Sequence, residues 1–304
     1  MLELKNVSFR YAKNMPLVLD NISLTFDKGE FVAITGRNGS GKTTITRLLT
    51  GLEKPSSGRV LYNGADVTKE EASDRSRFIG YVFQQPDRQM FMPTVREEIA
   101  FGPFHQGKRG EELENAIDRA MDDTDTKSLE NEYPRTLSRG DQQRVAIASA
   151  LAMDTEYLVL DEPTSGLDPL MQAVFLDLVR EEKANGTTVF MSSHILSEVA
   201  DVCSRVVFIA HGKVVRDVTS QQLEEESGKR VRVVASGVLT PPKNARYIDS
   251  GKRGKYHELA FVHHGSGPEL QAWVAGVKGL VDFYVADHSL EDAITELYGK
   301  ETTV

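Results

Sequence analysis

The sequence predicts an α/β fold with a parallel sheet at its core, because short apolar runs alternate with segments of helical periodicity. The runs that have the length of buried strands are Phe31–Thr35, Tyr157–Leu160 and Thr188–Ser192. The chain has 304 residues, which is long for a single domain, and its pattern changes after residue 218. We therefore expect two units of different size.

The larger unit is expected over residues 1–218. It opens with two alternating apolar runs, at 2–9 and 17–26, which predict an antiparallel β subdomain. A polar segment with helical periodicity, at about 85–152, then interrupts the alternation of strands and helices, and its clearest helix is 111–122. We expect this segment to form a helical subdomain.

The rest of the chain has a different pattern. A polar run at 219–228 predicts a linker, and residues 229–304 predict a small α+β accessory domain. Its expected strands and helix are 230–235, 256–262, 269–277 and 281–286, of which 269–277 is the helix. We interpret this domain as a regulatory or dimer-stabilising element.

Composition limits the possible partners and location. The formal net charge is −9, and the acidity lies in residues 1–228, which carry 26 Lys and Arg against 36 Asp and Glu. Nucleic acid is therefore not an expected partner, since binding to it depends on neutralising phosphates. No apolar stretch approaches the roughly 18 residues of a membrane span, and the amino terminus lacks the pattern of a secretory signal. We expect a cytoplasmic protein whose one cysteine, Cys203, is buried and structural.

A glycine-rich loop carries the clearest chemical signal. The run Gly36–Thr44, GRNGSGKTT, follows the strand 31–35 and opens a helical segment at 44–49. This is the order of a P-loop, in which successive backbone N–H groups and a helix N-terminus surround phosphate oxygens. The residues expected to bind nucleotide there are Gly36, Asn38, Gly39, Ser40, Gly41, Lys42, Thr43 and Thr44. Lys42 would reach the β- and γ-phosphates and Thr43 would ligate Mg²⁺, whereas an accidental glycine-rich turn is the alternative that this context disfavours.

Two acidic residues end a strand far downstream. Asp161 and Glu162 follow the apolar run 157–160, at the end of a strand where open α/β sheets bind ligands. Asp161 suits Mg²⁺, and Glu162 suits the general base that polarises the water attacking a γ-phosphate. Taken alone, such a pair would more often begin a solvated loop. Together with the P-loop it indicates hydrolysis of ATP.

At this point the chain resembles the nucleotide-binding subunits of ABC transporters, over residues 1 to about 218. The resemblance implies adenine stacking for Tyr11, in SFRY, and contact with the γ-phosphate and Mg²⁺ for Gln84, in YVFQQP. It implies a switch role at the γ-phosphate for His194, in MSSH, and communication between two cassettes for the loop that contains Asp168, in SGLD. The alternative for Tyr11 is an aromatic residue packed in the core beside a strand. The alternative for His194 is a purely structural histidine.

The signature motif of that family corresponds here to Leu137–Arg144, LSRGDQQR, which departs from the usual form. Family members carry Gly where Arg139 stands and Gln or Glu where Asp141 stands. Ser138 and Gly140 are retained, and the resemblance implies that they face the ATP held by a second cassette. Our hypothesis is that Arg139 partly compensates the negative charge of Asp141 near the triphosphate.

The resemblance also implies partners: integral-membrane subunits at the cytoplasmic face of the membrane, and a second cassette in a homo- or heterodimer, with ATP and Mg²⁺ as ligands. The direction of transport stays open. Segments 85–91 and 95–103 resemble the ATPases of energy-coupling-factor importers of vitamins or metal ions, whereas segments 162–170, 186–199 and 289–294 resemble the ATPases of multidrug or antibiotic exporters. A soluble ABC ATPase without a transport role and a non-hydrolysing subunit are the remaining alternatives.

Overall fold

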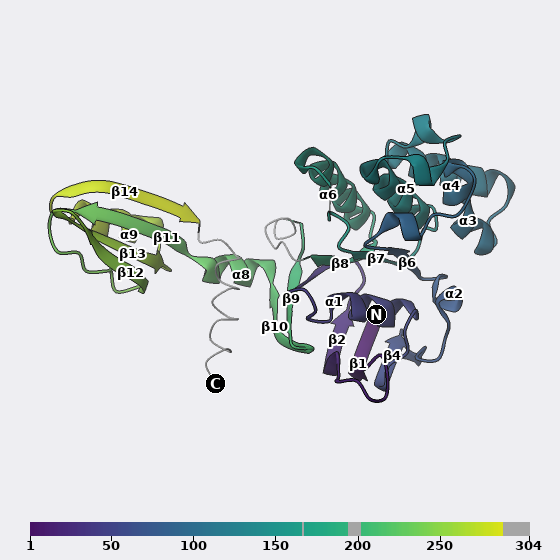
Figure 1. Cartoon of the computed structure of the whole chain (residues 1–304), viewed down its shortest axis with the longest axis horizontal. Helices are drawn as coiled ribbons and strands as arrows, with labels where there is room; N and C mark the ends of the chain where they lie inside the picture. Colours follow the sequence, from purple (N-terminus) through teal and green to yellow (C-terminus); the bar gives the residue numbers. More distant parts are fainter. Residues whose placement is uncertain (166, 194–201, 288–304) are drawn as a thin grey trace. The chain divides into compact units, whose positions relative to one another are not determined.

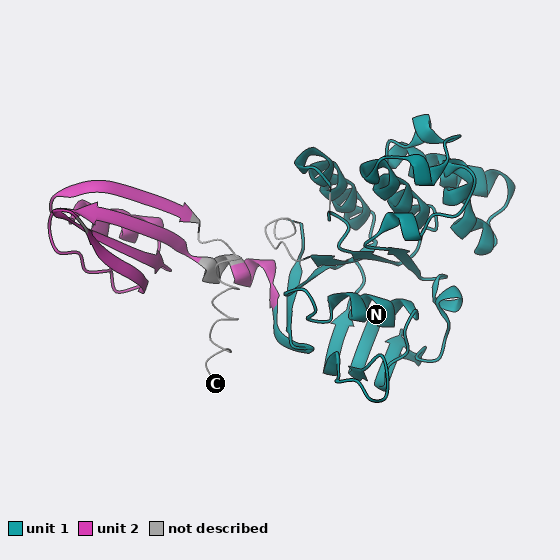
Figure 2. Cartoon of the chain, viewed as in Figure 1, with its two compact units in different colours: residues 1–217 teal, residues 218–304 magenta. Residues whose placement is uncertain are grey.

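The computed structural model describes residues 1–165, 167–193 and 202–287. It divides the chain into two compact units, residues 1–217 and residues 218–304 (Figure 2). Each unit has its own sheet and its own core, so the two are treated separately below.

The first unit begins with an antiparallel sheet. Its strand order is β2 (Leu19–Phe26), β1 (Leu2–Phe9), β4 (Ser57–Tyr62) and β5 (Ala65–Asp66). β1 is antiparallel to both of its neighbours and alternates buried with more exposed residues, which is the pattern of a strand with one covered face.

A six-stranded sheet forms the centre of this unit. Its order is β10 (Lys213–Thr219), β9 (Arg205–Ala210), β3 (Phe31–Thr35), β8 (Thr188–Ser193), β7 (Tyr157–Asp161) and β6 (Ile79–Val82). The pairings from β9 through to β6 are parallel. Every residue of β3, β7 and β8 is buried, as expected for parallel strands covered on both faces. Their carboxyl ends therefore meet at one edge of the sheet.

Helices cover this sheet on both sides (Figure 1). Helix α1 (Lys42–Thr50) lies on the side of the antiparallel sheet, and α3, α4, α5 and α6 lie on the other side. The bounds of the remaining helices are α2 (Ala72–Arg75), η1 (Pro86–Arg88), α3 (Val95–His105), α4 (Gly110–Asp123), η2 (Lys127–Leu129), η3 (Pro134–Thr136), α5 (Arg139–Leu151) and α6 (Pro169–Ala184). Among the described residues, none of the helices is both long enough and apolar enough to cross a bilayer.

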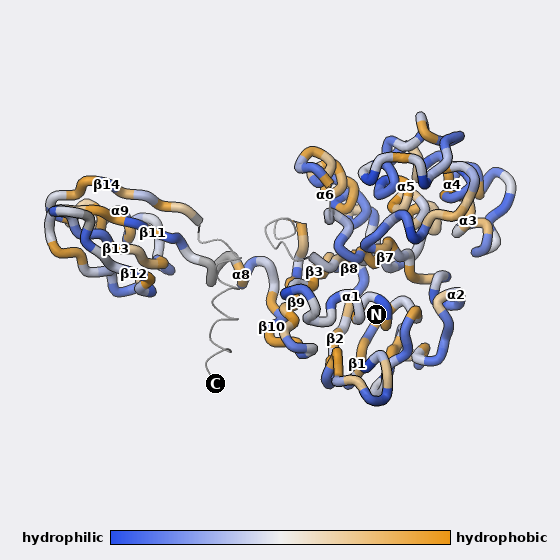
Figure 3. Tube along the Cα trace, viewed as in Figure 1, coloured by the Kyte–Doolittle hydropathy of each residue, from blue (hydrophilic) through white to orange (hydrophobic). Residues whose placement is uncertain are grey.

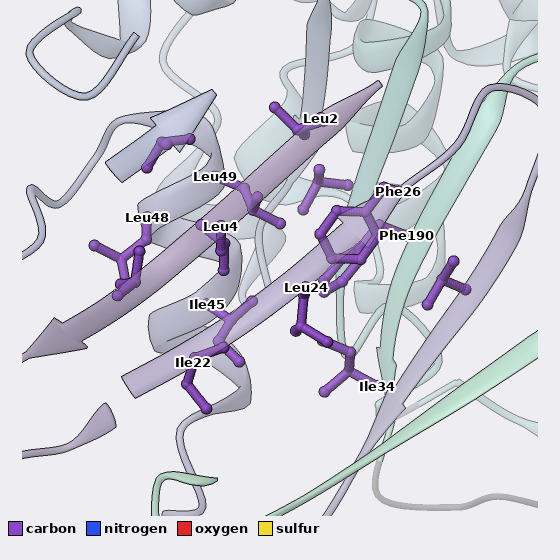
Figure 4. Packing of buried hydrophobic residues seen from close by; sticks show 14 of the residues in the cluster. Leu2, Leu4, Ile22, Leu24, Phe26, Ile34, Ile45, Leu48, Leu49 and Phe190 are labelled. Carbon is purple, nitrogen blue, oxygen red and sulfur yellow. The ribbon is translucent and has the colours of Figure 1, made fainter. Parts of the chain in front are cut away.

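The main core joins the antiparallel sheet to α1 and the central sheet (Figure 4). Leu4 and Leu24 belong to one buried cluster with Ile45 and Leu49 of α1, and the ring of Phe26 meets that of Phe190 edge to face with centroids 4.9 Å apart. In Figure 3 the strands of this unit are coloured largely hydrophobic and many of the connecting loops hydrophilic. Because α1 is clamped between two sheets, its amino-terminal end is held in a fixed place.

The described residues of the second unit form a four-stranded antiparallel sheet, with the helix α9 packed on it. The strand order is β12 (Ala245–Arg253), β13 (Tyr256–His263), β11 (Lys229–Ala235) and β14 (Leu280–Asp287), and the helix is α9 (Gly267–Ala275). Trp273 of α9 packs edge to face on Phe261 of β13, with centroids 5.0 Å apart. The polar run that we expected to be a linker instead contains a helix, α8 (Ser220–Ser227), and β12 is a strand that the sequence pattern did not predict.

Candidate functional site

The P-loop links the carboxyl end of β3 to the first turn of α1. Gly41 precedes the helix with φ of 111°, and no side chain caps the N–H groups of the first turn there. A Cβ on Gly36 would lie 2.3 Å from the carbonyl oxygen of Ile209, so only glycine fits at that position. The uncapped first turn of α1 therefore presents backbone donors at the positive end of a helix dipole.

Lys42 is held at the base of this loop. Its side chain is 4% exposed, and its Nζ donates a hydrogen bond to the carbonyl oxygen of Gly36 at 2.9 Å. The same Nζ lies 3.4 Å from Oε1 of Glu162. Nearby, Oγ of Ser40 is buried with no hydrogen-bond partner. An ammonium and an unused hydroxyl therefore accompany the open N–H groups of the loop, which suits a phosphate chain.

Asp161 ends β7 directly opposite the first turn of α1. Its Oδ1 accepts hydrogen bonds from Oγ1 of Thr43 at 3.1 Å and from Oγ of Ser192 at 2.7 Å, and its Oδ2 accepts a longer one from the hydroxyl of Tyr81 at 3.4 Å. Burial raises the pKa of Asp161 in spite of the hydrogen bonds from Ser192 and Thr43, which lower it. Burial likewise raises the pKa of Tyr81, so its hydroxyl remains a donor at neutral pH. A buried carboxylate with few compensating charges is well suited to bind a cation.

Glu162 is fixed through its backbone and its side chain. Its φ is 46°, in the left-handed region that a non-glycine residue seldom adopts. Its N–H contacts the hydroxyl of Ser192 at 2.9 Å, and its Oε2 accepts a hydrogen bond from Nε2 of Gln84 at 2.8 Å. With Oε1 near Lys42, both carboxylate oxygens have a partner. A strained backbone that orients a buried acid is a common feature of catalytic sites.

The structure thus brings Lys42, Thr43, Gln84, Asp161 and Glu162 into one connected cluster at the carboxyl edge of the sheet. His194 lies outside the described residues, so its expected place beside this cluster stays a prediction. Ser192 and Tyr81 belong to the cluster although the sequence had not singled them out. The signal for Ser192 was a polar residue near the carboxyl end of a buried strand.

Tyr11 lies beside the P-loop. Its ring is edge to face with that of Phe9, and its hydroxyl is 3.1 Å from Oγ1 of Thr44. The residue is 50% exposed, so it is not a core aromatic. It also lines an open cavity of about 760 Å³ together with Arg10 and Lys13. An aromatic face is therefore accessible next to the phosphate-binding loop.

The signature segment forms the start of α5. Ser138 caps the helix: its Oγ accepts from the N–H of Asp141 at 3.2 Å and donates to Oδ2 of the same residue at 2.7 Å. Asp141 also forms an ion pair with Arg144. Partial burial opposes the charge of Asp141, but the hydrogen bonds from Arg144 and Ser138 outweigh it and lower its pKa. Arg144, rather than Arg139, is therefore the ion-pair partner of this carboxylate, and compensation by Arg139 near a bound triphosphate stays a prediction.

Arg139 instead contacts the loop after Glu162: its Nη2 donates to the carbonyl oxygen of Ser165 at 3.0 Å. Asp168 caps α6 by accepting a hydrogen bond from the N–H of Met171 at 3.0 Å. Within the described part of the chain, no hydrogen bond joins Ser138, Gly140 or Asp168 to the P-loop. Ser138 and Asp168 instead cap the helices α5 and α6.

Comparison with known proteins agrees with this geometry. The ABC transporter family matches residues 19–165. An ABC transporter ATP-binding protein of Pyrococcus furiosus is 41% identical over 214 residues, which are 70% of this chain and 82% of that protein. The chain belongs to the ABC transporter ATP-binding family. The α/β fold class and the resemblance inferred from the motifs are both confirmed.

Other ABC proteins extend the comparison. The energy-coupling factor transporter ATP-binding protein EcfA of Methanothermobacter thermautotrophicus is 37% identical over 73% of this chain and 72% of its own length. Among solved structures, a dimeric post-hydrolysis state of the cassette MJ0796, bound to ADP and Pi, has a TM-score of 0.67 at 28% identity and covers 72% of this chain and 99% of that one. The structure of cbiO1 from Clostridium perfringens, part of the complex cbiONQ, has a TM-score of 0.67 at 31% identity and covers 74% and 90%. The present chain is thus an ABC ATP-binding subunit of a transporter.

Proposed function

We propose that this ABC subunit hydrolyses ATP, with Mg²⁺ as the cofactor, to drive a transporter whose membrane-spanning subunits are separate chains. It would then be held at the cytoplasmic face of the membrane by those subunits. The observation that carries the proposal is the connected cluster in which Lys42 contacts Glu162 and Thr43 contacts Asp161.

The cluster fits both ligands. Lys42, the uncapped first turn of α1 and the unpartnered hydroxyl of Ser40 would hold the phosphates. Thr43, Asp161 and Gln84 offer the hydroxyl, carboxylate and amide oxygens that Mg²⁺ prefers. Bound there, Mg²⁺ would neutralise charge on the β- and γ-phosphates.

The residues suggest how hydrolysis would proceed. Lys42 leaves Oε1 of Glu162 for a phosphate oxygen, which frees that carboxylate to accept a proton from the attacking water. Gln84 keeps Oε2 in place, and the hydrogen bonds that the N–H of Glu162 donates to Ser192 keep the backbone of Glu162 in its left-handed conformation. No covalent intermediate is needed, since phosphoryl transfer depends on positioning and on charge neutralisation.

We further propose the family arrangement of two cassettes with ATP between them. Tyr11 would stack on adenine, since its ring is accessible beside Thr44. Ser138 and Gly140 would face the ATP of the other cassette, and Asp168 would lie near the junction of the two. His194 would contact the γ-phosphate. The dimeric state of the related MJ0796 cassette supports this arrangement.

The proposal is tested by Glu162→Gln. Glutamine keeps the size and the contact with Gln84 but cannot accept a proton, so we expect a fall in ATP turnover of about 100-fold or more. ATP binding, measured by calorimetry, should be no weaker than in the unchanged protein. Glu156→Gln is the matched control, because Glu156 is a partly exposed acid that pairs with Lys28. Turnover near the unchanged rate in Glu162→Gln would remove Glu162 from its role.

For the membrane partner we propose the energy-coupling-factor class. Two similarities favour it: EcfA among the relatives and cbiO1 among the structures. The segment that suggested this class also presents Phe91, which is 55% exposed and could meet a partner. Purification of the chain from solubilised membranes should recover polytopic subunits of this kind. Recovery of a large exporter permease would overturn the class, and recovery of soluble partners alone would overturn the transport role.

A further inference from the structure

Arg139 occupies an unusual position in the cassette. It is the first residue of α5, directly after the helix cap Ser138, and its side chain is exposed. Its guanidinium does not serve Asp141, whose ion-pair partner is Arg144. Nη2 of Arg139 instead donates to the carbonyl oxygen of Ser165, 26 residues further along the chain. A glycine at this place would have no side chain that could form this bond.

The hydrogen bond of Arg139 leads toward the catalytic cluster. The N–H of Ser165 donates to the carbonyl oxygen of Glu162 at 3.1 Å, so the two peptide groups form one turn. Thr164, between them, is 4% exposed and anchors the turn in the protein. The N–H of Glu162 in turn contacts Ser192, whose hydroxyl donates to Asp161. Arg139 is therefore two hydrogen bonds away from the backbone of Glu162.

Arg139 and Glu162, which this chain of hydrogen bonds connects, would lie next to different ATP molecules. In the proposed dimer, Ser138 and the start of α5 face the ATP of the other cassette, whereas Glu162 acts on the ATP bound by its own P-loop. A displacement of α5 on closure of one site would pull on the Ser165 turn, because the guanidinium holds its carbonyl oxygen. The turn cannot shift freely without affecting Glu162, whose left-handed φ of 46° is already restricted.

We infer that Arg139 is a positioning residue that couples the two ATP sites of the dimer through the Ser165 turn. This inference rests on the proposed function, since it needs two ATP sites. The contact is a single exposed hydrogen bond, so we expect coupling at the low end of the usual range, about five-fold in the affinity of the second site. A five-fold coupling between two sites corresponds to a Hill coefficient of about 1.4.

The test is the dependence of ATP turnover on ATP concentration in the full chain. We expect a Hill coefficient near 1.4 for the unchanged protein and near 1 for Arg139→Ala, with partial recovery in Arg139→Lys, which keeps a charged donor. Lys127→Gln is the control: it removes an exposed cation of the same helical subdomain, one that pairs with Asp122. Each curve is measured at two protein concentrations about tenfold apart, since cooperativity that comes from dimer assembly changes with concentration.

The outcomes separate the two proposals. A Hill coefficient that is the same in Arg139→Ala and in the unchanged protein overturns the coupling role, as does a value of 1 in the unchanged protein at both concentrations. Either result leaves the ATPase proposal intact. Loss of cooperativity that Arg139→Lys does not restore, together with a lowered melting temperature, would show that Arg139 only stabilises α5. Absence of ATP turnover in the unchanged protein would instead refute the proposed function, and the coupling with it.

Discussion

Arg75→Met is expected to destabilise the first unit by about 3–5 kcal/mol. Arg75 is fully buried, and its guanidinium donates to the carbonyl oxygens of Leu48 at 2.7 Å, Leu49 at 2.8 Å and Val67 at 2.6 Å. Leu48 and Leu49 lie in the last turn of α1, so Arg75 satisfies carbonyls that the helix leaves open and supplies positive charge at the negative end of its dipole. Burial lowers the pKa of Arg75, although an arginine stays charged at neutral pH.

The size of the effect follows from these contacts. A buried carbonyl left without its donor costs about 1–3 kcal/mol, so Leu48 and Leu49 together cost at least about 2 kcal/mol. The carbonyl of Val67 keeps the N–H of Glu70 at 3.0 Å, so its loss of the charged donor adds about 1 kcal/mol. Removing the buried charge of Arg75 also removes its desolvation penalty. The net loss of stability is therefore smaller than the sum of the largest values for the three carbonyls. Methionine retains an unbranched apolar stem, so a cavity contributes little.

The assay is urea unfolding followed by circular dichroism, with the transition of the first unit as the readout. Arg77→Met is the matched control: Arg77 is half exposed and pairs with Glu70, so its loss should cost less than about 1 kcal/mol. A loss below about 1 kcal/mol for Arg75→Met would refute the reasoning, because it would mean that water or a local shift satisfies the three carbonyls.

Two further predictions concern the helical subdomain. Asp141→Asn should lower the stability of the first unit by about 0.5–1 kcal/mol at pH 7, since it removes the ion pair with Arg144. The pKa of Asp141 is lowered in the folded state, so this stabilisation is fully present above the pKa of Asp141 in the unfolded chain. It disappears as the pH falls through the pKa of the folded state. A difference in urea midpoint between Asp141→Asn and the unchanged protein that is equal at acid and neutral pH would contradict the prediction. Glu98→Ala should speed hydrogen exchange of the Phe91 and Met92 amides by about tenfold or more, because Oε2 of the buried Glu98 accepts both N–H groups at 2.9 and 2.8 Å. Glu98→Gln, which keeps an acceptor oxygen, should leave both amides protected, and equal exchange in the two variants would contradict the assignment.

The sequence predicted those parts of the fold that depend on local pattern. The strand 31–35 has the predicted bounds, and the P-loop follows it in the expected order, because the motif fixes strand, loop and helix within a few residues of each other. The helix α8 could also have been predicted. Thr219 and Gln222 form a capping box, but the polar composition of the run led us to expect a linker.

What could not be predicted depends on which elements become neighbours. The contacts of Ser192 and Tyr81 with Asp161 exist because β8 and β6 flank β7. The sequence of a single strand does not determine which strands become its neighbours in the sheet. The two arginines of the signature segment show the same division. Arg144 is three residues from Asp141, so helix geometry alone could have identified it as the partner, whereas the contact of Arg139 with Ser165 requires the packed tertiary structure.

The ion pair between Lys42 and Glu162 has a consequence for how variants of this site are interpreted. Without nucleotide, the carboxylate of Glu162 pairs with the ammonium of Lys42. A phosphate of ATP would bind the same ammonium, so ATP and the general base compete for Lys42. Every measured ATP affinity then includes the free energy of separating that buried pair. Glu162→Gln abolishes the competitor along with the base, and its affinity for ATP should exceed that of the unchanged protein. An ATP affinity measured on the Glu162→Gln variant would therefore be higher than the ATP affinity of the unchanged, hydrolysing subunit.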